Sequence, residues 1–178
     1  MANLLTGIRL LLILPVAWSM ADEKLMPGLV TLLLILVAII TDFFDGIVAR
    51  ARGTASPTGM LFDHGTDFVF VTSGMAGLAW AGHLHWILPV AIAVAFSQYV
   101  LDSYLLFRQK QLRMSFLGRW NGILYFLPLT LVALSRALPD GSFPEQLIST
   151  VPWIGTALIL STLASIVDRG VAEYRQTH

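Results

Sequence analysis

Residues 27–49 read PGLVTLLLILVAIITDFFDGIVA, an apolar run whose second half carries two aspartates, Asp42 and Asp45. A helix needs about 20 mostly apolar residues to cross the hydrocarbon core of a bilayer, and this run is long enough. Of the 178 residues in the chain, 56% are hydrophobic and 12% are charged, and the mean hydropathy is +0.75. Soluble domains carry about 25% charged residues. The sequence therefore predicts an integral membrane protein.

Apolar runs of similar length lie on both sides of this stretch. They predict six transmembrane helices, near residues 4–20, 27–49, 60–81, 86–107, 116–137 and 151–170. The longest connection, from about residue 136 to 150, is rich in turn formers and too short for a soluble domain. Gly74 and Gly77 are expected to be helix-packing positions, because small residues let helices approach closely. We therefore expect residues 1–178 to form one all-α membrane domain.

Basic residues are concentrated around residues 50–59 and 108–119 and in the C-terminal tail. At the opposite ends of the predicted helices the basic residues are Lys24 and Arg136. Cytoplasmic connections carry an excess of lysine and arginine, so we expect both termini to face the cytoplasm, in a bacterial-type inner or cell membrane. Arg9 lies inside the first apolar run and not ahead of it, which argues against a cleaved signal peptide.

Two features of the composition exclude some classes of functional site and partner. The chain has no cysteine, which excludes disulfides, thiolate metal sites and cysteine nucleophiles. Its formal net charge of +0 argues against a nucleic-acid partner, which would need a basic face. The function therefore has to be sought in the positions of the charges.

Four acidic residues gather where the second predicted helix ends and the third begins: Asp42, Asp45, Asp63 and Asp67. The first two are spaced i, i+3 and the last two i, i+4, so each pair lies on one face of its helix. An ionised carboxylate near the bilayer centre costs about 2.5–3.5 kcal/mol on insertion scales, so the set needs cations. Oxygen donors without cysteine favour Mg²⁺ or Mn²⁺, and two such ions offset four negative charges.

Small residues surround these acids. Gly46 and Ala49 share the face of the first pair, and Gly59 lies one turn before the second, so a flat base or a diphosphate could approach the backbone. Arg50 offers the planar fork of donors that suits a diphosphate. His64 points about 100° away from Asp63 on a helix, which favours a role behind the ligands or in packing. The residues indicate a two-metal site for a diphosphate substrate, in a polar, metal-lined cavity open to the cytoplasm.

The spacing Asp-x2-Asp-Gly-x2-Ala-Arg-x8-Gly-x3-Asp-x3-Asp, from Asp42 to Asp67, resembles the signature of the CDP-alcohol phosphatidyltransferases, membrane enzymes of phospholipid synthesis. The resemblance implies that metals hold the diphosphate of a CDP-linked lipid, an alcohol attacks the lipid-side phosphorus, and CMP leaves. It implies that the four aspartates bind the metals and that Asp67 is also the general base. The expected CDP-lipid site comprises Gly46, Ala49, Arg50, Ser56 and Gly59.

Two further segments bear on the substrates. The opening Asn3-Leu4-Leu5-Thr6-x2-Arg9 resembles members that use CDP-diacylglycerol, notably phosphatidylglycerophosphate and cardiolipin synthases. The stretch Ser115-x2-Gly118-Arg119 resembles the branch that uses glycerol 3-phosphate. The candidate ligands for an acceptor phosphate are Arg108, Arg113 and Arg119.

The acceptor stays open, because Phe68 and Asn121 stand where many members of that branch carry basic residues. Inositol phosphate, serine and phosphatidylglycerol are the alternatives to glycerol 3-phosphate. The resemblance also implies a homodimer that contacts membrane lipids. Two other functions use similar residues. A membrane prenyltransferase would have a second aspartate-rich motif, whereas this sequence has one acidic cluster. A divalent-cation transporter could use the carboxylates as a binding ring, but it would give the Gly-x2-Ala-Arg segment no role.

Overall fold

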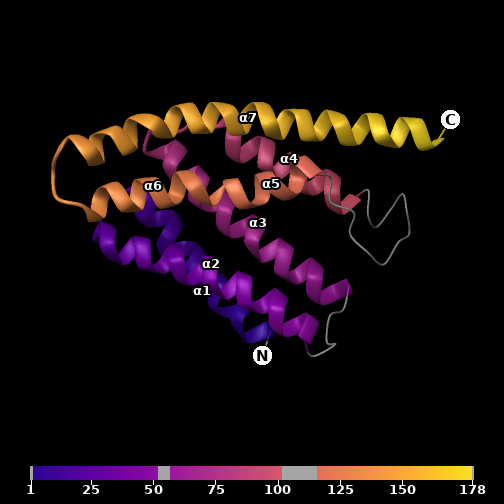
Figure 1. The fold of residues 1–178 in the computed structure, drawn as a ribbon, viewed down its shortest axis with the longest axis horizontal. Coiled ribbons are helices and arrows are strands. Elements are labelled where there is room, and N and C mark those ends of the chain that lie inside the picture. Colours follow the sequence, from indigo (N-terminus) through magenta and orange to yellow (C-terminus); the bar gives the residue numbers. More distant parts are fainter. Residues whose placement is uncertain (1, 52–56, 102–115, 178) are drawn as a thin grey trace.

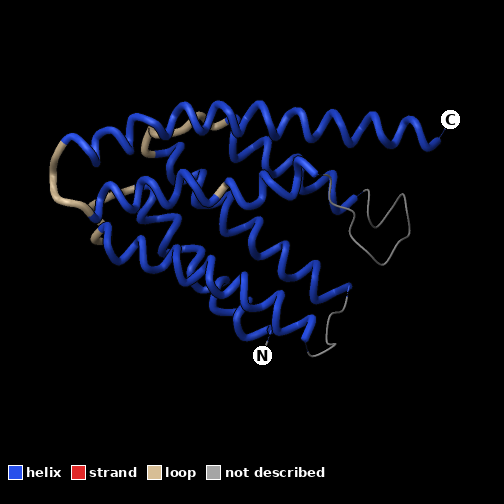
Figure 2. Tube along the Cα trace, in the orientation of Figure 1, coloured by secondary structure: helices blue, strands red, loops and turns tan. Residues whose placement is uncertain are grey.

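The computed structural model describes residues 2–51, 57–101 and 116–177, without the side chains of residues 2–4, 45–51, 57–58, 60, 116 and 172–177. Every regular element in these ranges is an α-helix (Figure 2), which confirms the all-α prediction. The helices are α1 (Ala2–Ala21), α2 (Gly28–Ala51), α3 (Pro57–Trp80), α4 (Ile87–Leu101), α5 (Phe116–Leu124), α6 (Phe126–Ala137) and α7 (Ser142–Thr177).

The helices run back and forth between two ends of one bundle (Figure 1). The start of α1, the end of α2, the start of α3 and the end of α7 lie toward one end, to the right in Figure 1. The connections from α1 to α2 and from α6 to α7 lie at the other end. Helix α1 packs on both α2 and α3, while α7 covers α4, α5 and α6. The end that holds the α2 and α3 acids is therefore also the end that holds both termini.

Two helix boundaries differ from the prediction. The expected fifth helix is divided at Tyr125 into α5 and α6. Pro128 contributes to the division, because proline has no N–H to donate to the carbonyl of Leu124 and its ring crowds that carbonyl. The last helix begins at Ser142, and not near residue 151, since Pro139, Asp140 and Gly141 are enough to make the turn.

Two helical segments are long and apolar enough to cross a membrane, Leu117–Ala137 and Ser142–Val171. The shorter apolar helices of the described part of the chain are Leu5–Ala21, Gly28–Phe44 and Ile87–Leu101. Six membrane crossings therefore stay a prediction. Many large apolar side chains are exposed on the outside of the bundle, among them Leu11, Trp18, Trp80 and Trp153. A surface of this kind is typical of a protein whose outer face meets lipid.

Helix α3 forms the centre of the bundle by close approach to its neighbours. A Cβ on Gly77 would run into the carbonyl oxygen of Ala17 in α1, and a Cβ on Gly74 would lie 2.9 Å from the side chain of Leu129 in α6. Both glycines are therefore packing positions, as predicted. Around them the core is fully buried and apolar, with Met75 and Leu78 as central members. This packing fixes the position of α3, and so of its acids, relative to α1.

Candidate functional site

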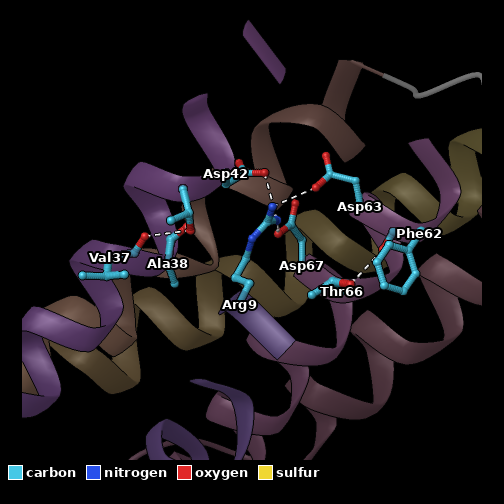
Figure 3. A network of polar contacts seen from close by, with 9 residues as sticks. Arg9, Val37, Ala38, Asp42, Phe62, Asp63, Thr66 and Asp67 are labelled. Atoms are coloured by element: carbon cyan, nitrogen blue, oxygen red, sulfur yellow. Dashed lines mark hydrogen bonds and ion pairs between the residues drawn. The ribbon is translucent and has the colours of Figure 1, made fainter. Parts of the chain in front are cut away.

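Three helices bring charged side chains to one point. Asp42 comes from the second half of α2, Asp63 and Asp67 come from successive turns of α3, and Arg9 comes from α1. The guanidinium of Arg9 lies among the three carboxylates (Figure 3). Its Nη1 donates to Asp42 Oδ1 at 3.0 Å, its Nη2 donates to Asp63 Oδ1 at 2.7 Å, and Nη1 also pairs with Asp67. We call Arg9, Asp42, Asp63 and Asp67 the charged cluster.

The charged cluster has a buried cation and partly open acids. The side chain of Arg9 is 0% exposed, whereas those of Asp42, Asp63 and Asp67 are 39%, 24% and 22% exposed. A buried guanidinium is tolerated only when it is paired, because an unpaired buried charge is very costly. The carboxylates satisfy it from one side and keep part of their surface open. Other cations could therefore reach these carboxylates from their open side.

His64 lies closer to the acids than its helical spacing predicted. One ligand atom from each of Asp63, His64 and Asp67 falls within 4.8 Å of the others, an arrangement that could hold a metal ion. The angular argument placed His64 on a different face from Asp63. The three groups still come together, because Asp67 lies one helical turn after Asp63 and the imidazole of His64 is long enough to reach both. The geometry thus allows His64 as a ligand, which was not expected.

A cavity of about 580 Å³ opens beside the charged cluster. Asp42, His64 and Asp67 contribute to its wall, whereas aromatic and aliphatic side chains supply most of the lining. Among them Phe68 stacks on Phe96 of α4, with ring centroids 4.1 Å apart and planes 5° from parallel. The volume falls in the range of about 300–1,000 Å³ that small-molecule sites occupy. A ligand with an apolar part and an anionic part would match both kinds of wall.

Two arginines line the same cavity as the acids. Arg119 extends from α5, and Arg169 extends from α7, where its guanidinium lies 5.0 Å from the ring centre of Tyr99. Asn121, 2% exposed, also lines the cavity and accepts a hydrogen bond from Ser161 at 2.6 Å. The wall of the cavity therefore carries both acidic and basic side chains.

The structure brings together part of the predicted site. Asp42, Asp63 and Asp67 converge, and Arg119 lines the adjoining cavity. Gly59 lies exposed in the first turn of α3. The remaining predicted residues of α2 lie in its last two turns, where the backbone alone is described: Asp45, Gly46, Ala49 and Arg50. The predicted residues outside the described ranges are Ser56, Arg108 and Arg113.

Two residues of the site were not predicted. From the sequence, Arg9 and Arg169 were counted only among the basic residues of the cytoplasmic side. A signal for Arg9 did exist, because it is an arginine within an apolar run, and ionisable residues at membrane depth are usually functional. Nothing in the sequence near Arg169 distinguishes it from a cytoplasmic anchor.

Comparison with known protein families identifies the family of this chain. The family model described as CDP-alcohol phosphatidyltransferase matches residues 1–167. The chain belongs to the CDP-alcohol phosphatidyltransferase family. Neither a curated protein sequence nor a solved structure gives a significant match.

Membership settles the class of reaction and confirms the predicted family. CDP-alcohol phosphatidyltransferases are phosphotransferases for substituted phosphate groups, and they transfer a phosphatidyl group from a CDP-alcohol. They are membrane-associated and typically use a divalent metal. The match includes all of α1 to α6 and most of α7. It therefore includes the charged cluster and the lining of the cavity up to Ile166, whereas Arg169 lies beyond it.

Proposed function

We propose that this chain transfers the phosphatidyl group of CDP-diacylglycerol to the hydroxyl of a small, phosphate-bearing alcohol, with glycerol 3-phosphate as the acceptor, and releases CMP. The observation that carries the proposal is one cavity whose wall includes Asp42 and Asp67 together with Arg119 and Arg169. The acids suit the metal-bound diphosphate of the donor. The arginines suit an anionic acceptor.

The donor atoms near the cavity fit a hard divalent cation. Carboxylate oxygens from α2 and α3 converge on the guanidinium of Arg9, and their outer sides are partly exposed. Oxygen-rich sites of this kind favour Mg²⁺ or Mn²⁺ over softer metals. We propose that Asp42, Asp45, Asp63 and Asp67 hold two such ions. The ions would supply charge stabilisation at the diphosphate.

The chain's own residues would orient the donor and move the proton. We assign the general base to Asp67, as the resemblance to the family implies; like Asp42, it belongs to the charged cluster and lines the cavity. It would take the proton of the acceptor hydroxyl as the oxygen bonds to the lipid-side phosphorus and the bond from that phosphorus to CMP breaks. Gly46, Ala49, Arg50, Ser56 and Gly59 are proposed to contact the cytidine diphosphate.

The apolar part of the donor and the phosphate of the acceptor would then contact different side chains of the cavity. The stacked rings of Phe68 and Phe96 give a place for the apolar part of the donor. Arg119 and Arg169 would bind the acceptor phosphate, with Arg108 and Arg113 as further candidates. We propose that this site faces the cytoplasm, with both termini on the same side, and that the protein acts as a homodimer, as its resemblance to the family implies.

A panel of alcohols identifies the acceptor. Purified protein is incubated with labelled CDP-diacylglycerol, Mg²⁺ or Mn²⁺, and one of glycerol 3-phosphate, serine, inositol, inositol phosphate or phosphatidylglycerol. We expect a labelled lipid product with glycerol 3-phosphate, and we expect Arg169→Gln to raise the KM for that alcohol about tenfold without changing the KM for the donor. Product from serine alone would exclude a phosphate-binding role for the two arginines.

A further inference from the structure

Arg9, the most deeply buried charged side chain among the residues that the structure describes, has no part in the reaction proposed above. Arg9 is 0% exposed and contacts three carboxylates that come from two other helices. Its partners Asp42 and Asp63 lie 33 and 54 residues away along the chain. An anchor for the membrane surface would point its guanidinium toward lipid headgroups. This guanidinium points into the acids (Figure 3).

We propose that Arg9 is a permanent internal cation that weakens divalent-ion binding to the aspartates and makes the ion-loaded site attract an anionic diphosphate. This inference rests on the proposed function, because it assigns a role to Arg9 toward the ions and the nucleotide of that reaction. Arg9 is then a positioning residue and is not itself a participant in bond making.

The balance of charge gives the first reason. Four aspartates and Arg9 carry a net charge of three negative units. Two divalent ions bring that sum to one positive unit, whereas without Arg9 the loaded site would be neutral. A nucleoside diphosphate carries negative charge on both phosphoryl groups. A site with a positive sum holds it more tightly than a neutral one, above all where burial reduces screening.

The position of the guanidinium gives the second reason. Arg9 bonds Oδ1 of Asp42 at 3.0 Å and Oδ1 of Asp63 at 2.7 Å, so any ion on these carboxylates would be a close neighbour of the guanidinium. Like charges at such a separation repel strongly when water is excluded. Divalent ions must therefore bind these aspartates less tightly than they would bind the same carboxylates without Arg9. A bound anionic diphosphate would offset this repulsion.

Two affinities measured on one variant test the inference. We expect Arg9→Gln, compared with wild type, to bind Mn²⁺ about tenfold more tightly and, at saturating Mg²⁺, to bind CDP about tenfold more weakly. Mn²⁺ binding is followed by electron paramagnetic resonance and CDP binding by calorimetry, both in detergent. Damage to the fold would lower both affinities, so the opposite signs separate the electrostatic role from a structural one.

Two other variants serve as controls. Arg9→Lys keeps the charge and should hold both affinities within about threefold of wild type. Arg136→Gln removes a positive charge at the opposite end of the bundle, where Arg136 donates to the carbonyl of Ser19 at 2.6 Å. It should leave both affinities unchanged.

Other results would overturn the inference. Equal or weaker Mn²⁺ binding by folded Arg9→Gln contradicts it, even when CMP release by wild type supports the proposed function. Absence of Mn²⁺ binding in every variant contradicts the metal site of the proposed function as well. Should Arg9→Gln fail to fold, the guanidinium signals of ¹⁵N-arginine-labelled wild type must shift on adding Mg²⁺, with Arg9→Lys used for assignment. An unchanged Arg9 signal again overturns the inference.

Discussion

Asp67 combines two properties at the scale of single residues. It pairs with Arg9 in the charged cluster, and it contributes to the wall of the cavity, which Asp63 does not. A carboxylate that reaches both the ions and the acceptor can hold a metal and receive a proton in the same step. We therefore expect Asp67→Asn to reduce CMP release from CDP-diacylglycerol by at least about a thousandfold while the protein stays folded.

The matched control for this change is Asp140→Asn. Asp140 is exposed in the turn between α6 and α7, far from the acids, and should tolerate the substitution with full activity. Circular dichroism and size-exclusion chromatography report whether each variant is folded. Undiminished CMP release by folded Asp67→Asn would remove Asp67 from the mechanism.

The acidic part of the site was predictable from the sequence, because its members follow helical spacing on two consecutive helices. The i, i+3 and i, i+4 spacing of the aspartates is enough to place each pair on one face, and Asp42, Asp63 and Asp67 do converge. Arg9 could not be assigned to them, because its contacts depend on how α1 packs against α2 and α3. Periodicity within a helix contains no information about that packing.

At the scale of helices, the close approach of α3 to α1 holds the site together. Gly77 faces the backbone of Ala17, and the same pair of helices carries Asp63 and Asp67 to Arg9. We expect Gly77→Ala to lower stability by about 1–3 kcal/mol, because the added methyl group forces the two backbones apart. Thermal unfolding in detergent measures the loss, and CMP release should fall with it.

Gly7→Ala is the matched control, in α1 itself. A Cβ on Gly7 meets nothing within 4 Å, so alanine there should be neutral or slightly stabilising through its better helix propensity. If Gly77→Ala and Gly7→Ala unfold at the same temperature as wild type, the contact between α1 and α3 is looser than the structure indicates.

Helix boundaries were less predictable than helix existence. Pro128 accompanies the division between α5 and α6, yet Pro15 lies inside α1 and Pro152 inside α7 without ending either helix. Proline removes one hydrogen bond in each case, and packing of the neighbouring turns decides whether the helix continues. Sequence patterns therefore locate the apolar helices but not the breaks within them.

At the scale of the whole molecule, the alternation of the helices predicts which parts share a side of the membrane. The chain has no cysteine, so single cysteines can report their own exposure without background. We expect an impermeant maleimide to label Lys24→Cys and Asp140→Cys from outside intact cells. It should label Thr177→Cys only after permeabilisation, because the cytoplasmic side carries the basic residues.

Labelling of all three positions from the same side would contradict the six-crossing arrangement. Labelling with the two groups exchanged would keep six crossings but reverse the orientation, and it would place the charged cluster at the outer face. Either result would reject the predicted topology and leave the family assignment unchanged, because that assignment does not depend on orientation.

The central claim is that the aspartates act through divalent ions on a CDP-linked lipid, and metal removal tests it most directly. CMP release from labelled CDP-diacylglycerol is measured with glycerol 3-phosphate in Mg²⁺ or Mn²⁺, after chelation with EDTA, and after the ion is restored. We expect CMP release with the ion, a fall to the level of Asp67→Asn under EDTA, and full recovery when the ion is restored. CMP release that continues undiminished in EDTA would contradict it.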